Sequence, residues 1–394
     1  MQLAFISHES FYQGPSGQWY ATAAFPSDFI AGGLPEMTRF TIWVRKKVLA
    51  AGEEGRLFSV PVPPGVEFEV VGPENERSGP IGYIWSLVRN LPSLWRLARN
   101  NEVLWCKLPS VFPAFVFKFA RKDCIRCVQV IGNVRESVRI LYPRLGWFAG
   151  WIDRCTRAAV QKANIAAFVS KALYLDYGLQ CRKSLVFHLG MLRPEQLYLD
   201  RPALHKPFRL LYVGRISKEK GLNFVIQALA KLPTVELRIA GAGPFAADCR
   251  LLAESLNVAD RIVWLGHLRW GKDLFHQYRE ADALIVPSLT EGLPQVAVEA
   301  QCHSLPVVAS EVGGLPEIIS SGDNGILFSP GDSDAIVAAV SEVAQESVWQ
   351  RLVEGARRGA ASHTIEKQMG RFLAEIRQIW QEKRHRNIGS DLTI

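Results

Sequence analysis

The sequence predicts an α/β protein built from two doubly wound parallel sheets. Short apolar runs that end at Gly, Pro, Ser or Asn alternate along the chain with helical patterns, as in repeated strand–helix–strand units. The 394 residues, 48% of them hydrophobic, are enough for two domains that each have a core of their own. Ligands of an open parallel sheet bind at the carboxyl ends of its strands, so functional residues are expected in the loops that follow the strands.

The apolar runs predict the order of the strands. In the first half of the chain they cover residues 2–7, 41–44, 58–61, 103–107, 127–131, 168–170 and 186–190. In the second half they cover residues 208–213, 236–240, 261–265, 283–286, 306–309 and 326–328. Apolar residues at helical spacing predict helices over residues 84–100, 147–167, 222–232, 294–303, 335–343 and 365–383.

Two glycine-bearing turns follow strands. The first strand leads into residues 14–17 ahead of an expected helical stretch, and a glycine at such a turn lets the backbone approach a phosphate closely. Gly17 is therefore a candidate binding residue. Gly241 and Gly243 imitate the dinucleotide fingerprint, but they follow the second strand of their domain, whereas that fingerprint belongs to the first strand. We therefore expect no dinucleotide there.

The most informative stretch is residues 283–328, which has the pattern strand, loop, helix, strand, turn, strand. Pro294 opens the helix, whose free N-terminal N–H groups attract anions. Glu291 in the loop and Glu299 in the helix would flank a phosphate bound there. Each carboxylate alone is equally typical of a solvated surface. Together with the helix they suit a sugar nucleotide, which is anionic in the middle and rich in hydroxyl groups at both ends.

Two cations follow the strand at residues 208–213. Arg215 and Lys220 lie in the loop at its carboxyl end, so both can reach the crevice where a diphosphate would bind. A guanidinium can hold two phosphate oxygens at once, whereas a lysine ammonium acts as a point charge.

The net charge of +8 lies in the first half of the chain. Residues 1–200 hold 24 Lys and Arg against 16 Asp and Glu, and residues 201–394 hold 22 against 22. This asymmetry predicts an anionic partner for the first half, either a membrane surface or a phosphorylated acceptor. No zinc finger, RNP-type strand or helix-turn-helix signal accompanies the basic residues, so no nucleic acid partner is expected.

The expected helix at residues 84–100 has Arg89, Arg96 and Arg99 between its apolar positions. Such a helix either packs an apolar stripe on the sheet or lies at a lipid surface with Trp85 and Trp95 at the boundary. Both alternatives remain open at this point.

Composition predicts the compartment. No run of about 18 apolar residues could span a bilayer, and the first residues lack the basic segment of a signal peptide. Seven scattered cysteines fit a reducing environment, and Cys124 and Cys127 form a single C-x-x-C pair that predicts no zinc site. We expect a cytoplasmic protein, with a peripheral position at the inner face of the membrane as the alternative that the basic half suggests.

Residues 291–299 resemble the donor-site signature of the retaining GT-B glycosyltransferases of family four. In that signature two glutamates eight positions apart bracket a Gly-hydrophobic-small stretch. Here it stands as Glu291, Gly292, Leu293, Pro294, Gln295, Val296 and Glu299. Family members also carry an Arg and a Lys in the loop that here holds Arg215 and Lys220. The resemblance covers nearly all of the second domain and is much weaker over the first.

The resemblance implies a GT-B fold, in which two Rossmann-like domains face a central cleft. Residues 1–190 would form the acceptor-side domain and residues 191–364 the donor domain. The last helix and the tail, residues 365–394, would cross back to the first domain.

The resemblance also implies roles for individual residues. Arg215 and Lys220 would act in catalysis together with Glu291, which would hold sugar hydroxyls, while Glu299 would hold the ribose. Leu268 lies where the family has its base-binding loop. Many members place a His near the donor sugar after a middle strand. This chain has Asn133 there, which could donate the same hydrogen bond but could not take up a proton.

The implied reaction is retaining transfer of a sugar from a nucleotide diphosphate sugar to an acceptor hydroxyl, in polysaccharide or glycolipid assembly. No protein nucleophile is evident, so the family implies front-face attack with the leaving phosphate as base, without cofactor or metal. The acceptor would be lipid-linked or a saccharide. A GT-B nucleotide-sugar epimerase and a non-catalytic sugar-nucleotide-binding protein are the alternatives. Asp332 and Asp334 imitate a metal-binding Asp-x-Asp, but Asp332 is expected to cap the helix at residues 335–343.

Overall fold

The computed structural model describes residues 1–21, 37–48, 58–60, 62, 64–71, 80–133, 135, 146–188, 192–201 and 203–391. The chain forms two compact units. The first comprises Met1–Phe187 together with Met369–Ile394, and the second comprises His188–Gln368. The boundaries expected from the sequence, at residues 190 and 365, lie a few residues from these. The ends of the strands expected at residues 58–61 and 186–190 fall outside the described residues.

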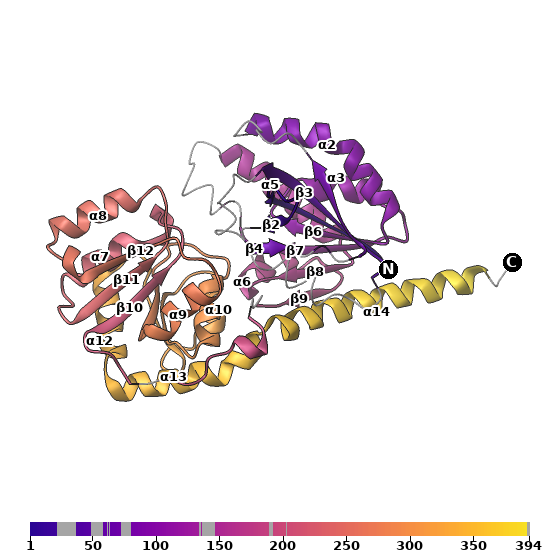
Figure 1. The fold of residues 1–394 in the computed structure, drawn as a ribbon. Coiled ribbons are helices and arrows are strands. Elements are labelled where there is room, and N and C mark those ends of the chain that lie inside the picture. Colours follow the sequence, from indigo (N-terminus) through magenta and orange to yellow (C-terminus); the bar gives the residue numbers. More distant parts are fainter. Residues whose placement is uncertain are drawn as a thin grey trace. The chain divides into compact units, whose positions relative to one another are not determined.

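The first unit is built on a mixed sheet (Figure 1). Its described strands are β1 Gln2–Gln13, β2 Trp19–Ala21, β3 Arg39–Val48, β4 Phe58–Val60, β5 Val66–Val71, β6 Val103–Leu108, β7 Ile125–Val130, β8 Ile165–Phe168 and β9 Ser184–Val186. The order is β4-β2-β1-β6-β7-β8-β9, with β3 paired to both β1 and β5. β2 pairs antiparallel with β1 and β4, whereas the other pairs are parallel. The sheet is thus parallel except at one edge.

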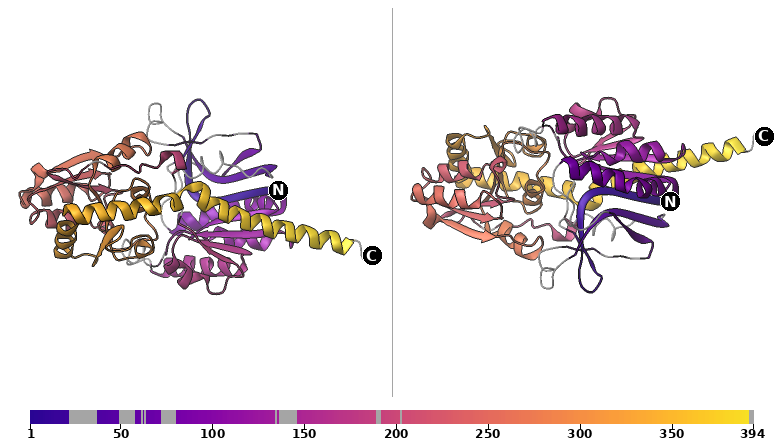
Figure 2. Two further views of the ribbon diagram at one scale, coloured as in Figure 1. Left: turned by 90° about the horizontal axis from the view of Figure 1, so that it is seen from below. Right: turned by 90° about the horizontal axis from the view of Figure 1, so that it is seen from above.

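Five α-helices of the described chain belong wholly or mainly to the first unit: α2 Pro80–Asn100, α3 Phe112–Phe119, α5 Gly146–Lys162, α6 Lys171–Leu173 and α14 Ile365–Asp391. Figure 2 shows α14, in yellow, lying against this unit. Its Phe372 is fully buried, with ring centroids 5.2 Å from Trp105 and 5.7 Å from Phe187. In the part of the chain that the structure describes, no helix is both long enough and apolar enough to cross a bilayer.

Two local expectations for the first unit were wrong. Residues 14–17 do not join a strand to a helix, because β1 continues to Gln13 and the turn closes a hairpin with β2. Gly14 N–H donates to Gln18 O (2.9 Å) across this turn. The helix expected to reach residue 167 ends at Lys162. Asn164 instead joins the sheet, since its N–H donates to Arg126 O at 2.7 Å and its Oδ1 accepts from Arg126 N–H at 2.8 Å.

The second unit contains six parallel strands in the order β12-β11-β10-β13-β14-β15. Their bounds are β10 Phe208–Val213, β11 Val235–Ala240, β12 Ile262–Gly266, β13 Ala283–Val286, β14 Val307–Ser310 and β15 Gly325–Phe328. Consecutive strands run outward from β10 in one direction as far as β12 and then in the other direction from β13. The loops after β10 and β13 therefore diverge, and this switch point is where such sheets bind ligands.

Helices cover the sheet of the second unit on both sides (Figure 1). They are α7 Leu222–Leu229, α8 Ala246–Ser255, α9 Lys272–Glu280, α10 Gln295–Cys302, α11 Leu315–Ile318, α12 Ser333–Val343 and α13 Glu346–Ala360. The expected cap of α12 is confirmed, because Asp332 Oδ1 accepts from the N–H groups of Asp334 (2.9 Å) and Ala335 (3.0 Å). Asp332 therefore caps the N-terminus of α12, as its position predicted.

Candidate functional site

A pocket of about 290 Å³ lies at the switch point of the second unit. Its walls come from the carboxyl ends of β10 and β13, the loops that follow them and the first turn of α10. The lining residues are Tyr212, Val213, Gly214, Arg215, Lys220, Ile285, Val286, Pro287, Ser288, Glu291, Leu293, Pro294, Gln295 and Val296. The pocket thus brings together seven of the residues that the sequence singled out.

Glycines let the loops of the pocket pack closely. Gly221 has φ +67°, and a Cβ there would lie 2.0 Å from Pro287 O. Gly313 has φ +56°, and its Cβ would lie 1.9 Å from Glu291 O. The N–H of Gly314 donates to Gly292 O at 2.7 Å. Since a side chain fits at neither glycine, the loop that carries Glu291 is held between two neighbouring turns.

Gly241 and Gly243 have a similar packing role. A Cβ on Gly241 would lie 1.9 Å from Gly214 O, and one on Gly243 would lie 2.1 Å from Ile216 O. These glycines allow the turn after β11 to pack on the loop that carries Arg215. Close contact between two loops accounts for the Gly-x-Gly spacing that resembles a dinucleotide motif.

The two cations of the pocket have different partners. Lys220 Nζ forms an ion pair with Glu291 Oε1, which also accepts from Ser288 Oγ at 2.9 Å. The side chain of Glu291 is 11% exposed. Among the residues that the structure describes, none pairs with the guanidinium of Arg215, which is exposed at the pocket wall. Within the described part of the chain, the pocket therefore offers one cation without a carboxylate partner and one whose charge Glu291 partly balances.

Helix α10 presents its N-terminus to the pocket. Leu293 and Pro294 lead into the helix, and Gln295 and Val296 form its first turn. The first N–H groups of an α-helix have no acceptor within the helix and carry a partial positive charge. With Arg215 they give this wall of the pocket the character of an anion site.

Glu299 lies in α10 behind the pocket wall and is only 4% exposed. Its Oε1 accepts from Trp270 Nε1 at 2.8 Å, and its Oε2 accepts from the Tyr278 hydroxyl at 2.7 Å. Burial raises the pKa of Glu299, and the two hydrogen bonds oppose that rise. The carboxylate that the resemblance assigns to the ribose is therefore already hydrogen-bonded within the protein.

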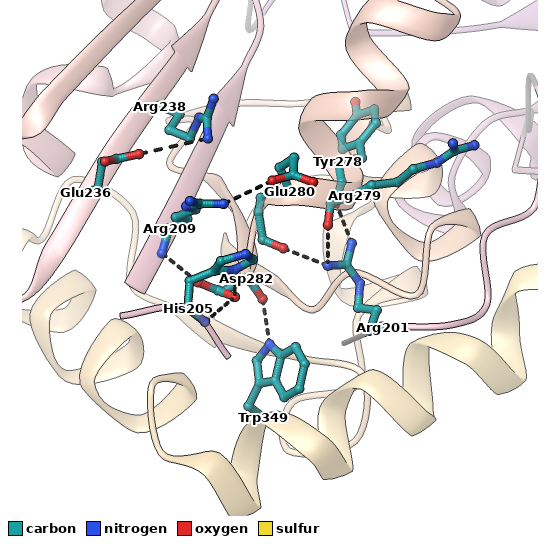
Figure 3. Close-up of polar contacts among 11 residues, drawn as sticks. Arg201, His205, Arg209, Glu236, Arg238, Tyr278, Arg279, Glu280, Asp282 and Trp349 are labelled. Carbon is teal, nitrogen blue, oxygen red and sulfur yellow. Dashed lines mark hydrogen bonds and ion pairs between the residues drawn. The ribbon is translucent and has the colours of Figure 1, made fainter. Parts of the chain in front are cut away.

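A polar network at the opposite, amino ends of β10 and β13 fixes α9 and α10 (Figure 3). Arg201 donates to Ala281 O (2.6 Å), just past α9, and to His303 O (3.1 Å), just past α10. Burial lowers the pKa of this arginine to about 10. Asp282, 1% exposed, accepts from His205 Nδ1 at 2.8 Å and from Arg209 N–H at 2.7 Å. These contacts hold the carboxyl ends of the two helices that carry Tyr278 and Glu299.

Three predicted binding residues lie elsewhere. Leu268 is half-buried in the loop after β12. Gly17 lies in the β1–β2 turn of the first unit, and Asn133 follows β7 in the same unit. Asn133 Nδ2 donates to Asp176 Oδ2 at 2.8 Å, and its Oδ1 accepts from Arg135 N–H at 2.9 Å. Binding roles for these residues stay predictions.

The sequence did not predict the residues that hold the expected site residues, Glu291 and Glu299, in position. Trp270 and Tyr278 hold Glu299, and Gly313 braces the loop of Glu291. Gly313 lies in the turn that the pattern of residues 283–328 predicts between two strands, but its contact with the loop of Glu291 is not encoded in local spacing. No pattern in the sequence links Trp270 or Tyr278 to a carboxylate on another helix.

Comparison with known proteins identifies the second unit. Residues 200–358 match the profile of the family described as Glycosyl transferases group 1. An uncharacterized glycosyltransferase of Methanocaldococcus jannaschii is 37% identical over 137 residues, 34% of this chain and 35% of that protein. D-inositol 3-phosphate glycosyltransferase of Mycolicibacterium smegmatis is 35% identical over 164 residues, 39% of this chain and 37% of that protein. The matches to these two relatives span little more than a third of their length.

Solved structures share the fold over nearly the whole chain. Sucrose-phosphate synthase from Thermosynechococcus elongatus has a TM-score of 0.71 at 17% identity, covering 95% of this chain and 99% of that one. The Anabaena protein HepE, solved with UDP-glucose, has a TM-score of 0.66 at 17% identity, covering 95% and 100%. The chain has the fold of the GT-B glycosyltransferases, and its residues 200–358 match the glycosyl transferases group 1 family.

Proposed function

We propose that the chain is a retaining glycosyltransferase that moves a hexose or related sugar from a nucleotide diphosphate sugar to an acceptor hydroxyl. The observation that supports this most is the pocket at the switch point. There the unpaired Arg215, the Lys220–Glu291 pair and the N-terminus of α10 surround about 290 Å³. A diphosphate is the anion that such a set of donors would stabilise.

In the proposed reaction the bond between the anomeric carbon and the β-phosphate oxygen breaks. A bond from the acceptor oxygen to the anomeric carbon forms on the same face, and the acceptor proton passes to the leaving diphosphate. Negative charge grows on the leaving oxygen, where Arg215, Lys220 and the helix N-terminus stabilise it. These cations do what a divalent metal does in other transferases, so the proposal includes no metal and no cofactor.

The carboxylates would orient the donor. Glu291 lies beside Lys220 at the pocket, within reach of sugar hydroxyl groups. Glu299 would hold the ribose. It lies four residues after Gln295 in α10, and positions four apart share one face of a helix.

The basic first half supports a lipid-linked acceptor or a saccharide on a lipid at an anionic membrane surface. Helix α2 buries Leu87, Leu94 and Leu97, so one face packs on the unit as one sequence alternative predicted. Its outer face leaves Trp85 52% exposed and Trp95 50% exposed. Tryptophans beside arginines on an exposed helix face are typical of contact with the interface of a membrane. A cytoplasmic protein peripheral to the inner face would fit this surface.

Donor turnover tests the proposal. UDP-glucose is the first donor to try, because the Anabaena protein of the same fold was solved with it. Released UDP and glycosylated acceptor would be measured with saccharide and lipid acceptors, and proton NMR would report the anomeric configuration of the product. We expect retention of configuration and undiminished turnover in the presence of a chelator.

Each other outcome would count against a defined part of the proposal. An inverted product would contradict the retaining mechanism, and activity lost in chelator but restored by manganese would contradict the metal-free one. Epimerised donor without transfer would indicate an epimerase. Tight binding without turnover across a broad acceptor panel would indicate a sugar-nucleotide-binding protein.

A further inference from the structure

Glu299 is enclosed by the donors that hold it. At 4% exposure, with Trp270 on Oε1 and Tyr278 on Oε2, the carboxylate has no open approach for a ligand hydroxyl. Each oxygen could accept a second hydrogen bond, but a ligand must first gain access. One of the two donor side chains therefore has to yield if a ligand binds Glu299.

Tyr278 is the fixed donor. It is fully buried in α9, and its ring stacks on His303 with centroids 5.2 Å apart. His303 Nδ1 donates in turn to the backbone carbonyl of Glu299 at 2.8 Å. Arg201 holds the carbonyl groups that follow both helices. Moving the Tyr278 hydroxyl would disturb every one of these contacts.

Trp270 is the movable donor. It is half-buried in a loop that lies between Gly266 (φ +69°) and Gly271 (φ +106°). A Cβ at either glycine would meet nothing within 4 Å, so there is free space beside both ends of the loop. Their carbonyl groups are anchored, because Gly266 O accepts from Gly241 N–H at 2.7 Å and Gly271 O accepts from Phe275 N–H at 2.8 Å. The indole contacts Phe275 edge-on, with ring centroids 4.9 Å apart. A glycine-bounded loop of this kind can reorient its side chain without unfolding a helix.

We propose that Trp270 is the exchangeable partner of Glu299, so that a ligand diol takes the place of the indole N–H at Oε1 while Tyr278 keeps Oε2 in position. The diol would be the 2′- and 3′-hydroxyls of a ribose whose phosphates occupy the adjacent pocket. This inference rests on the proposed function, because it needs a nucleotide in that pocket. Tyr278 is then a positioning residue, and Trp270 sets how strongly the site prefers a ribonucleotide to a deoxynucleotide.

The exchange has a measurable consequence. A ribonucleotide replaces one hydrogen bond to Glu299 with its own, whereas a deoxynucleotide gains nothing from displacing the indole. Removing the indole N–H leaves Oε1 unoccupied until a ribose arrives. We therefore expect Trp270→Phe to bind ribonucleotides about two- to tenfold more tightly and deoxynucleotides as before.

The test is a set of dissociation constants measured by calorimetry on the full chain. The probes are UDP, GDP and ADP with their 2′-deoxy and 3′-deoxy counterparts. We expect wild-type protein to favour the ribonucleotide of its preferred base by about two- to tenfold, because the diol exchanges for a hydrogen bond that Glu299 already has. Tyr278→Phe should bring that ratio close to one, because Glu299 is no longer oriented, and Trp270→Phe should raise it.

Matched controls separate these effects from general damage. Trp264→Phe changes a half-buried tryptophan on β12 beside Arg250, and Tyr198→Phe changes a tyrosine that lies beside Arg279. Both controls should leave the ratio unchanged. A ratio lowered in Trp270→Phe, or unaltered in Tyr278→Phe, would overturn the inference while leaving nucleotide binding, and with it the proposed function, intact. Absence of binding to every nucleotide would overturn both.

A spectroscopic readout reports the exchange directly. The indole N–H resonance of Trp270 in ¹⁵N-labelled protein is the one missing from Trp270→Phe. A saturating ribonucleotide should shift it toward the position of an indole without a carboxylate acceptor, and the matching deoxynucleotide should shift it less. A resonance unmoved by the ribonucleotide would show that the indole stays on Glu299 and would overturn the inference.

Discussion

Arg215 and Lys220 face the same pocket with different partners, and this difference can be measured. Arg215→Ala removes a cation that no described side chain neutralises, so nucleotide binding should weaken by about 1.5 to 3 kcal/mol, roughly ten- to 150-fold. Lys220→Ala also leaves Glu291 with Ser288 as its remaining described donor and places an unbalanced carboxylate near the phosphates. We expect the larger loss for Lys220→Ala, measured by calorimetry with UDP.

Lys218→Ala is the matched control for both variants. Lys218 is exposed in the same loop, over the ring of Phe245 at 5.8 Å, and it does not line the pocket. Its loss should change nucleotide affinity by less than about twofold. Near-normal affinity in the Arg215→Ala, Lys220→Ala double variant would remove the assignment of the pocket to a diphosphate.

His303 links the stability of the second unit to pH. Burial lowers its pKa to about 4, from 6.5 in an exposed histidine, so between these values the unfolded chain binds the proton and the folded protein does not. The free energy of unfolding should therefore rise with pH across this window. The stability that depends on neutral His303 should be fully present above pH 6.5 and should be lost as pH falls toward 4. A depression of this size corresponds to about 3 kcal/mol.

His303→Asn tests this coupling. The amide can still donate to the carbonyl of Glu299 but does not titrate, so the stability gap between variant and wild type should change by about 3 kcal/mol between pH 7 and pH 4. Denaturant unfolding at several pH values gives the gap. His276→Asn, the same substitution at an exposed position in α9, is the control.

At the scale of elements, the loop after β13 depends on a glycine from another turn. Gly313→Ala would place a Cβ 1.9 Å from Glu291 O and should displace the loop, weakening nucleotide binding by more than about tenfold. Gly322→Ala is a matched control, since Gly322 also has a positive φ, +85°, but nothing lies within 4 Å of its Cβ. Both variants should lose about 1 kcal/mol of stability from backbone strain. Equal nucleotide affinity in the Gly313→Ala and Gly322→Ala variants would show that the close contact between Gly313 and the loop of Glu291 does not matter for binding.

The outer face of α2 predicts salt-dependent binding to anionic vesicles. Arg89 lies over the ring of Trp85 (5.2 Å) and Arg99 over that of Trp95 (6.0 Å), and each basic side chain near such a surface contributes about 1 kcal/mol. Sedimentation with phosphatidylglycerol vesicles should show binding at low salt, release at high salt and loss of binding in Arg89→Glu, Arg99→Glu.

Arg96 is left unchanged in that variant because it lies 3.5 Å from Glu69, so that a glutamate there would also disturb the fold. Lys206→Glu, Lys272→Glu is the control of equal charge change, at exposed positions of the second unit. Equal binding to neutral and anionic vesicles would leave α2 an ordinary solvated surface.

Elements whose structure is determined by their own residue pattern were predictable from the sequence. β10 and β13 begin and end at the expected residues, because a buried parallel strand is a continuous apolar run bounded by turn residues. The pocket followed from the strand order, since the loops after β10 and β13 leave the carboxyl edge of the sheet in opposite directions and open a crevice between them. The strand expected at residues 168–170 begins earlier, as β8 Ile165–Phe168, because IAAF fits the end of a helix as well as a strand and pairing with β7 decided between them. The partners of Glu299 come from α9 and from the loop before it, and their packing against α10 is not recorded by the spacing of residues in one segment.

At the scale of the whole molecule, the first unit is assembled from two distant segments. Phe372, from the last helix, is fully buried against Trp105 and Phe187. Phe372→Ala should therefore cost the first unit about 3 to 5 kcal/mol. Calorimetry with and without UDP separates the units, because the ligand raises only the transition of the unit that binds it. The transition unaffected by UDP should move down in the variant. A shift confined to the UDP-sensitive transition would contradict this division.

The split of the first unit has a consequence for the order in which a new chain folds. The second unit is one continuous segment, His188–Gln368, and all of it has left the ribosome before Phe372 can reach its place. The half of the protein that is translated first is thus the half whose core closes last. Until then its apolar surface near Trp105 and Phe187 stays exposed. A chain stalled or cut before residue 372 would therefore hold a folded second unit joined to an incomplete first unit whose exposed apolar surface chaperones and proteases would recognise.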